Sequence, residues 1–114
     1  ASHEPMAALV TRVEVDPSDP RGRDPEKPVG PVLGQDPGGA ARRTPDGAGW
    51  RRVVPSPWPC AVRELPVIAG VLEHSHVIAG GGGGVPVTAT GQPVAGVVDK
   101  DRVAALLAIR LDAA

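Results

Sequence analysis

Short apolar runs, separated by polar residues and prolines, predict strands at several places along the chain. Residues 6–15 alternate in part between apolar and polar positions, and the run ends at Asp16-Pro17. Because proline has no N–H donor and favours an extended residue before it, this run predicts a strand. Further short apolar runs predict strands near residues 51–54, 76–79 and 85–87.

Two segments have the spacing of helices. Residues 61–74 predict a helix with Pro66 in its first turn and an apolar face formed by Val67, Ile68, Val71 and Leu72. Residues 102–111 are rich in Ala and Leu and predict a second helix. Asp101 is its expected N-cap, because a carboxylate there accepts the free N–H groups of the first turn.

Residues 16–49 have a different composition from the rest of the chain. They contain prolines at 17, 20, 25, 28, 31, 37 and 45, seven glycines, and little apolar periodicity. A segment of this length without regular structure is usually functional or disordered. We predict a long loop or a projecting lobe that is less ordered than the remainder.

The composition limits the size of the core. The 114 residues suffice for one domain at most, and Gly (15) and Pro (14) together form about a quarter of them. The chain has no Phe or Tyr, and its aromatic residues are Trp50 and Trp58. Large aromatic side chains usually dominate burial, so we expect a thin core of aliphatic residues.

The charge and the cysteine content indicate which partners are not expected and in which cellular compartment the protein is expected. The formal net charge is −1, so neither nucleic acid nor an anionic membrane is an expected partner. A single cysteine, Cys60, excludes an internal disulfide, and no apolar stretch approaches the ~20 residues that span a bilayer. His74 and His76 have no evident third ligand for a metal. A cytoplasmic protein without a metal site of its own is therefore expected.

Five consecutive glycines, Gly80 to Gly84, are followed by the triplet Asp99-Lys100-Asp101 at the start of the second predicted helix. Glycines allow positive φ angles, so successive N–H groups in such a turn can point toward an anion, and a nearby lysine adds positive charge. This pattern indicates a phosphate site. A run of glycines is equally typical of a flexible linker, and the run lacks the Gly-Lys-Ser/Thr ending of a P-loop.

Five blocks carry a resemblance to a known family. SHEPMAALVTRVEVDPSDP, PEKPVGPV, GWRRVVPSPWP, VIAGGGGGVPV and VDKDRVAALLA resemble, in this order, segments of the carbamate kinases, which belong to the amino acid kinase family. The blocks extend from about residue 6 to residue 107. The Gly-Gly-Asn-Ala turn and the nucleotide-binding half of those enzymes have no counterpart, so the chain resembles a central fragment.

The resemblance implies an α/β fold. The expected architecture is part of a three-layer α/β/α sandwich with a mainly parallel sheet. Residues 1–114 would form an incomplete amino acid kinase domain. Within it, residues 16–49 would form the projecting lobe, and residues 50–114 would supply a strand, a helix, a strand, the glycine loop and a helix.

The same resemblance implies a chemistry. Carbamate kinases transfer a phosphoryl group between carbamoyl phosphate and ADP, giving ATP and carbamate, with Mg²⁺, in arginine catabolism. Lys27 of the lobe would reach the substrate phosphate, Lys100 would neutralise the moving phosphoryl group, and Asp101 would hold catalytic lysines in place. Gly81, Gly82 and Gly83 would bind substrate. The full-length enzyme is expected to be a homodimer.

The chain also departs from the family pattern. Arg21-Gly22 and Val32-Leu33 replace residues that are usually Ala-Phe and an aromatic pair, and the segment before Asp99 is about three residues short. Without the resemblance, Lys27 is an ordinary solvated lysine. Two hypotheses remain: carbamate kinase sequence whose isolated fragment is inactive, or a partly disordered, non-catalytic remnant that binds at most anions or a partner chain.

Overall fold

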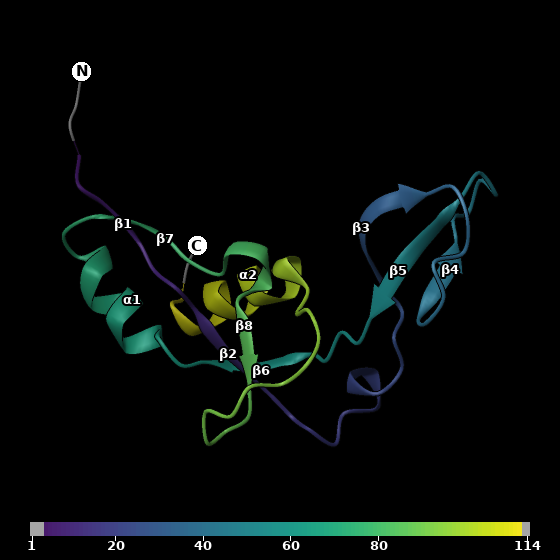
Figure 1. The fold of residues 1–114 in the computed structure, drawn as a ribbon. Coiled ribbons are helices and arrows are strands. Elements are labelled where there is room, and N and C mark those ends of the chain that lie inside the picture. The colour runs from purple at the N-terminus through teal and green to yellow at the C-terminus, as the bar shows by residue number, and fades with distance from the viewer. Residues whose placement is uncertain (1–3, 113–114) are drawn as a thin grey trace.

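The protein consists of an α/β body and a separate three-stranded sheet that projects from it (Figure 1). The computed structural model describes residues 4–112. Within these residues the body contains five strands and two α-helices, and the projecting sheet, here called the lobe, contains three strands. None of the described helices has the length and apolar character needed to cross a bilayer.

The body strands pair mainly in parallel. β1 (Met6–Ala8) runs parallel to β7 (His76–Ile78). β2 (Arg12–Val15) lies between β8 (Val85–Val87), to which it is parallel, and β6 (Pro59–Val62), to which it is antiparallel. The strand predicted at residues 6–15 is therefore present as two strands. The mainly parallel sheet expected of this α/β fold is confirmed.

The break between β1 and β2 accommodates the glycine turn. Thr11 lies in this break with its side chain buried, and its hydroxyl donates to the Leu9 carbonyl oxygen over 3.2 Å. The same hydroxyl accepts the Gly80 N–H over 2.8 Å. A buried hydroxyl needs such partners, because leaving it unpaired would cost free energy. Thr11 thus joins the strand break to the turn that follows β7.

The first helix differs from its predicted bounds. α1 covers Leu65–Leu72, shorter than the predicted 61–74, because residues 59–62 pair with β2 as β6. Pro66 lies in its first turn, as expected. The predicted apolar face is only partly buried: Ile68 is 2% exposed, whereas Val67 is 51% exposed. Glu64, just before the helix, binds the Arg12 guanidinium with distances of 3.0 and 2.8 Å.

The second helix, α2, covers Lys100–Arg110, and its N-cap is Asp99. The prediction that Asp101 caps this helix is wrong. Asp99 has extended backbone angles, and its Oδ1 accepts the N–H groups of Asp101 (2.8 Å) and Arg102 (3.3 Å). An N-cap must be non-helical and lie two or three residues before the N–H groups that it satisfies, and Asp101 is already inside the helix.

The core is small and aliphatic, as predicted. Its buried residues come from β2, β6, both helices and the loop before α2: Val13, Val15, Val62, Ile68, Val98 and Val103. None of these side chains is larger than isoleucine. Each helix contributes one fully buried residue to this core, Ile68 of α1 and Val103 of α2, and Leu106 and Leu107 of α2 pack against it partly buried.

Much of the segment predicted as a long loop or a projecting lobe has regular structure. β3 (Lys27–Leu33), β5 (Trp50–Val54) and β4 (Ala41–Arg43) form an antiparallel sheet in that order. β5 is expected with residues 50–114, yet it pairs inside the lobe. Pro28 and Pro31 do not prevent pairing, because β3 is an edge strand and proline is tolerated there. A short 3₁₀-helix, η1 (Pro20–Gly22), precedes the lobe.

Candidate functional site

The glycine run forms a turn of defined conformation between β7 and β8. Gly80 adopts a left-handed φ of 70°, and η2 (Gly81–Gly83) follows it. The Gly83 N–H donates to the Gly80 carbonyl oxygen over 2.9 Å, so this N–H is used within the turn. Gly81 and Gly82 are exposed, and no atom lies within 4 Å of the place where a Cβ would be. The backbone of these two glycines is the part of the turn that a ligand can approach.

The start of α2 places two lysine–aspartate pairs next to one another. Lys100 Nζ lies 2.9 Å from Asp101 Oδ1, and this contact raises the pKa of Lys100, which keeps the ammonium charged. The N–H groups of Asp101 and Arg102 lower the pKa of Asp99, and the nearby Lys27 adds to this lowering. Opposite charges therefore alternate along this helix start.

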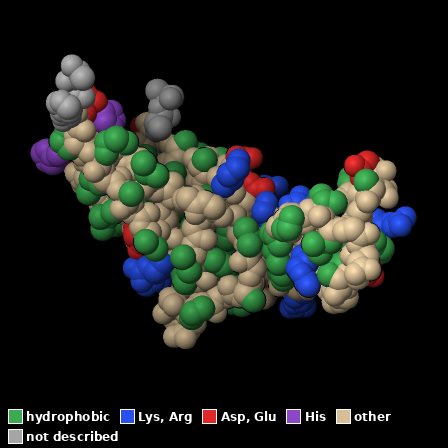
Figure 2. Space-filling model, turned by 45° about the horizontal axis from the view of Figure 1, so that its top comes forward, with side chains coloured by type: hydrophobic (Ala, Val, Ile, Leu, Met, Phe, Trp, Pro, Cys, Tyr) green, Lys and Arg blue, Asp and Glu red, His purple; other side chains and the backbone are tan. Residues whose placement is uncertain are grey.

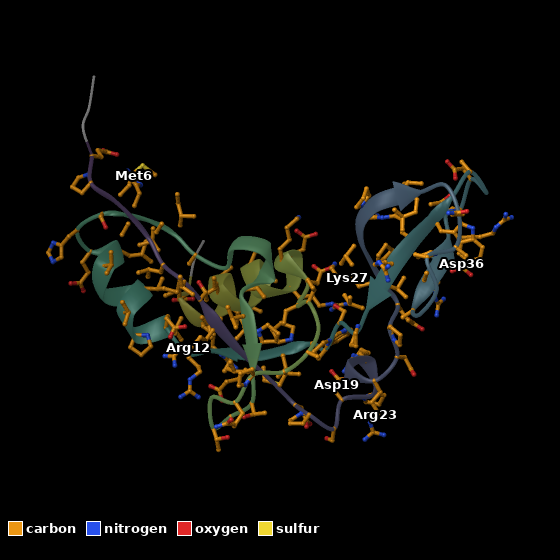
Figure 3. All side chains as sticks on the ribbon, viewed as in Figure 1. Met6, Arg12, Asp19, Arg23, Lys27 and Asp36 are labelled. Atoms are coloured by element: carbon orange, nitrogen blue, oxygen red, sulfur yellow. The ribbon has the colours of Figure 1, made fainter. Side chains whose placement is uncertain are left out.

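Lys27 reaches this helix start from the lobe (Figure 3). It is the first residue of β3, where it pairs with Val54. Its Nζ lies 3.4 Å from Asp99 Oδ2, and both side chains are about one third exposed, at 30% and 36%. The structure thus brings a lobe lysine to the first residue of the Asp-Lys-Asp triplet, across 72 positions of sequence.

Two hollows flank the start of α2. The first, here called the Lys27 hollow, has a volume of about 380 Å³ and lies between the lobe and α2, with Lys27, Asp99 and Arg102 in its lining. The second, the Lys100 hollow, is about 420 Å³ and is lined by residues that include Gly80, Lys100 and Asp101. Charged side chains of both signs gather where the lobe meets the body (Figure 2). The two lysines therefore lie near one helix terminus but line different hollows.

Lys27 is the one expected site residue in the lining of the Lys27 hollow. Arg21, Trp58 and Arg102 line it together with Lys27, and both guanidinium groups lie against the Trp58 indole. Arg21 stands where the family pattern differs, which is the one signal in the sequence that pointed to it. The sequence indicates Asp99 only as part of the Asp-Lys-Asp triplet. Its contact with Lys27 depends on how the lobe packs and has no local sequence signal.

The described residues do not form a metal site of their own. Residues 4–112 contain no group of three or more His, Cys, Asp or Glu side chains that is able to hold a metal ion. His76 instead contacts the Glu4 carboxylate at the other end of the body. Asp99 and Asp101 are the carboxylates nearest the lysines, and both already have partners.

Comparison with known proteins gives consistent relatives. No protein-family model matches the chain. It is 41% identical to carbamate kinase of Escherichia coli K12 over 116 residues, which cover 96% of this chain and 39% of that protein. It is also 41% identical, over 109 residues, to carbamate kinase of Thermococcus kodakarensis, covering 86% of this chain and 35% of the relative. Among solved structures, carbamate kinase from Giardia lamblia bound to citric acid superposes with a TM-score of 0.83 at 35% identity.

The chain belongs to the carbamate kinase family. The superposition with the Giardia lamblia enzyme covers 94% of this chain and 38% of that structure, so it includes the lobe as well as the body. A second Giardia carbamate kinase structure agrees, with a TM-score of 0.77 and 36% identity. The chain thus has part of the amino acid kinase fold. It spans about two fifths of the length of the carbamate kinases that it matches, 39% in the case of the Escherichia coli K12 protein.

Proposed function

We propose that this chain supplies the carbamoyl phosphate side of a carbamate kinase site. The reaction would transfer a phosphoryl group between carbamoyl phosphate and ADP, giving ATP and carbamate. The observation that carries this proposal is the approach of Lys27 Nζ to Asp99 Oδ2, 3.4 Å, next to Lys100. A lobe lysine and a helix-start lysine thereby lie at one helix terminus.

Each lysine has a distinct role in this proposal. In the forward direction the bond between phosphorus and the carbamate oxygen breaks, and a bond to a terminal phosphate oxygen of ADP forms. This chemistry needs charge neutralisation and alignment more than a strong nucleophile. Lys100, held by Asp101, would stabilise the charge of the moving phosphoryl group. Lys27 would leave Asp99 to bind the phosphate of the incoming substrate.

The lobe has to adjust for both lysines to contact one phosphate. Lys27 and Lys100 line different hollows, with the Asp99 cap between them. Lys27 belongs to a strand whose sheet projects from the body, so a small rotation of the lobe would move its ammonium group along the helix start (Figure 1). Closure of a lobe over bound substrate is a common way to exclude water and complete a site. Gly81 and Gly82, exposed beside the Lys100 hollow, would offer N–H groups to the same anion.

The nucleotide and Mg²⁺ would be partners of this chain in the reaction. Mg²⁺ in phosphoryl transfer is commonly bound by substrate phosphates and one or two carboxylates, and it supplies charge neutralisation there. The described residues offer no dedicated metal site, so we assign no step of this chain to the ion. The homodimer expected from the resemblance and the cytoplasmic location expected from the sequence composition remain predictions.

The proposal is tested by titrating the isotopically labelled chain with carbamoyl phosphate and following amide shifts by NMR. Shifts should concentrate at Gly81, Lys27 and Lys100, and they should be lost in Lys27→Ala and Lys100→Ala. Arg52→Ala is the matched control, because it removes an exposed lobe cation on β5. Equal binding by all three variants would contradict the proposed site.

A second candidate is a non-catalytic chain that only binds anions or a partner. The structure supports it in one respect: Lys27 and Lys100 line different hollows, and each ammonium group already has a carboxylate partner, so the two lysines do not converge on one position. Phosphoryl transfer loses most of its acceleration when the reacting groups are not held together. A coupled assay distinguishes the two. We expect the isolated chain to make no ATP from carbamoyl phosphate and ADP. Turnover that disappears in Lys100→Ala would instead show that the chain is catalytic by itself.

A further inference from the structure

Trp58 lies between two arginines that come from different parts of the chain. The guanidinium carbon of Arg21 is 3.8 Å from the centroid of the indole ring, and that of Arg102 is 3.6 Å from it. Two guanidinium groups this close to one centroid cannot share a face of the ring without overlapping, so they cover opposite faces. Both contacts have the geometry of cation–π interactions. We call Arg21, Trp58 and Arg102 the Trp58 stack.

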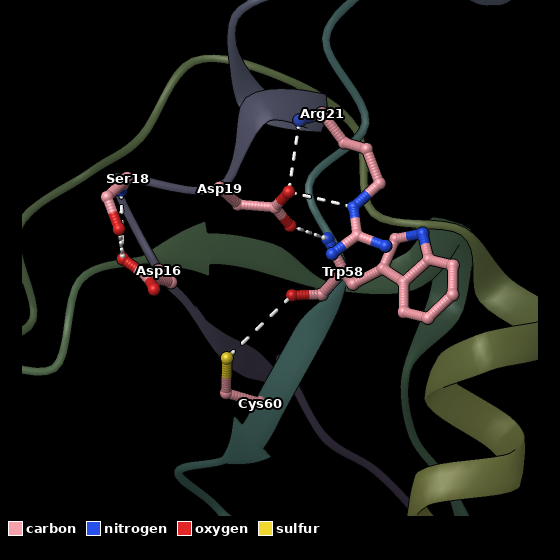
Figure 4. A network of polar contacts seen from close by, with 6 residues as sticks. All are labelled: Asp16, Ser18, Asp19, Arg21, Trp58 and Cys60. Carbon is pink, nitrogen blue, oxygen red and sulfur yellow. Dashed lines mark hydrogen bonds and ion pairs between the residues drawn. The ribbon is translucent and has the colours of Figure 1, made fainter.

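A buried carboxylate fixes one side of the stack (Figure 4). Asp19 Oδ1 accepts from Arg21 Nε over 2.7 Å and from the Arg21 backbone N–H over 3.0 Å. Its other oxygen accepts the Trp58 backbone N–H over 3.0 Å. Asp19 therefore holds both the guanidinium of Arg21 and the backbone of Trp58, and it balances one of the two positive charges around the indole.

The stack bridges the two segments that carry Lys27 and Asp99. Arg21 belongs to η1, which leads into the lobe six residues before Lys27. Arg102 is in the first turn of α2, three residues after Asp99. The three side chains of the Trp58 stack line the Lys27 hollow together with Lys27 and Asp99. A change in the stack would therefore shift the base of the lobe relative to the start of α2.

We propose that Trp58 is a positioning residue, whose two-sided stacking between Arg21 and Arg102 holds the base of the lobe against α2 and sets the approach of Lys27 to Asp99. Its importance for phosphoryl transfer rests on the proposed function. Its effect on the Lys27–Asp99 contact does not.

The Lys27–Asp99 pair is too weak to hold the lobe by itself. Both side chains are about one third exposed, and exposed ion pairs contribute little because water screens the charges and long side chains lose entropy. Backbone hydrogen bonds also act at the base of the lobe, from Ser56 N–H to the Arg21 carbonyl and from Val97 N–H to the Pro55 carbonyl. Neither of these reaches α2 itself. The Trp58 stack reaches α2 through Arg102.

The first part of the test detects the stack. In a Trp50→Phe background Trp58 is the only indole, and its fluorescence quenching by acrylamide reports how much of the ring is accessible. Arg102→Leu uncovers one of the two faces, so the quenching constant should rise by up to about two-fold. Arg110→Leu is the control, because it removes an arginine from the far end of the same helix and should leave quenching unchanged. An unchanged constant in Arg102→Leu would overturn the proposal.

The second part measures the effect on Lys27. Trp58→Leu changes no charge, so the charged groups around Asp99 are all retained: Arg21, Asp24, Glu26, Lys27, Lys100, Asp101 and Arg102. If the stack holds Lys27 in place, the pKa of Asp99 measured by ¹³C NMR should rise in Trp58→Leu, because its cation moves away. In a Lys27→Gln background the same substitution should cause no further rise.

The outcomes separate positioning from general destabilisation. Trp58→Phe keeps an aromatic face, so the pKa of Asp99 should stay close to its value in the unsubstituted chain. If Trp58 only filled space, leucine would serve as well as phenylalanine, and the two variants would have the same Asp99 pKa. The proposal would be overturned if Trp58→Leu raised the pKa of Asp99 equally with and without Lys27, or did not raise it at all. The measurement needs neither substrate nor turnover. The positioning role of Trp58 can therefore hold even if the proposed function fails, and the proposed function can hold even if Trp58 has no positioning role.

Discussion

Gly83 packs its α-carbon against the carbonyl oxygen of Val98, so closely that a Cβ on Gly83 would lie 1.8 Å from that oxygen. Gly83 is buried and has a φ of 93°, and Val98 is fully buried immediately before the Asp99 cap. The glycine turn and the segment that leads into α2 are therefore in direct backbone contact. The position of the Asp-Lys-Asp triplet depends on this contact.

Gly83→Ala should destabilise the protein strongly. A Cβ would collide with backbone, which cannot move aside as a side chain can, and the positive φ adds strain. We expect a loss of at least ~3 kcal/mol in the free energy of unfolding, measured by urea denaturation. Gly81→Ala is the control: nothing lies within 4 Å of its Cβ position, and the change should stay within ~0.5 kcal/mol. Equal effects of the two substitutions would contradict the packing described.

Asp19 should make stability depend on pH in acid. The Arg21 side-chain hydrogen bond, followed by the Trp58 backbone N–H, lowers the pKa of Asp19 to about 2 from an ordinary value of 3.8. A lowered folded-state pKa means that the stabilisation is complete above the ordinary value and is lost as the pH falls through about 2. The urea midpoint should therefore decline between about pH 4 and about pH 2, and Asp19→Asn should remove part of this decline. Asp24→Asn, an exposed aspartate nearby, is the control, and an identical decline in both variants would refute the prediction.

The lobe should be the least protected part of the described chain in hydrogen exchange. Val53 is the buried hydrophobic residue of the lobe strands, whereas β2 alone buries Val13 and Val15. Local opening is easiest where few apolar contacts are lost. Residues 77–79 also pack against the core through Val77 and Ala79, so amides paired within the lobe sheet should exchange about 100-fold faster than those of β2 and β7. Similar protection in the lobe and in residues 77–79 would contradict this.

Lys27 and Lys100 should affect kinetics differently in a complete enzyme. The suitable protein is a chimera in which this chain replaces the matching segment of Escherichia coli carbamate kinase. Lys100→Ala should lower kcat by ~100-fold or more, the scale expected when one charge-stabilising donor is lost. Lys27→Ala should raise KM for carbamoyl phosphate at least as much as it lowers kcat, because the contact forms as the lobe closes.

Arg52→Ala is again the control and should leave both constants unchanged. Unchanged kinetics in both lysine variants would show that the roles taken from the family resemblance do not apply to Lys27 and Lys100. The chimera would still establish whether this segment supports the reaction.

The amino-acid sequence alone determined the local elements of the body and the character of its core. The strands at β7 and β8, the position of Pro66 in the first turn of α1 and the turn at Gly80 follow from apolar runs, proline and glycine, whose preferences act within a few residues. The absence of Phe and Tyr predicted the aliphatic core. The family resemblance predicts that Lys27 and Lys100 act in one site.

The tertiary structure alone decided the contacts between distant segments. Residues 27–33 form a strand because β5 pairs with them, and no local pattern in this Pro- and Gly-rich segment requires it. The same holds for Lys27 at Asp99 and for the Trp58 stack, whose members lie far apart in sequence. Asp99 rather than Asp101 caps α2 because the helix already begins at Lys100. Local conformational preferences determine where strands, turns and helices form. Only the packing of the lobe against the body determines which charged groups come into contact.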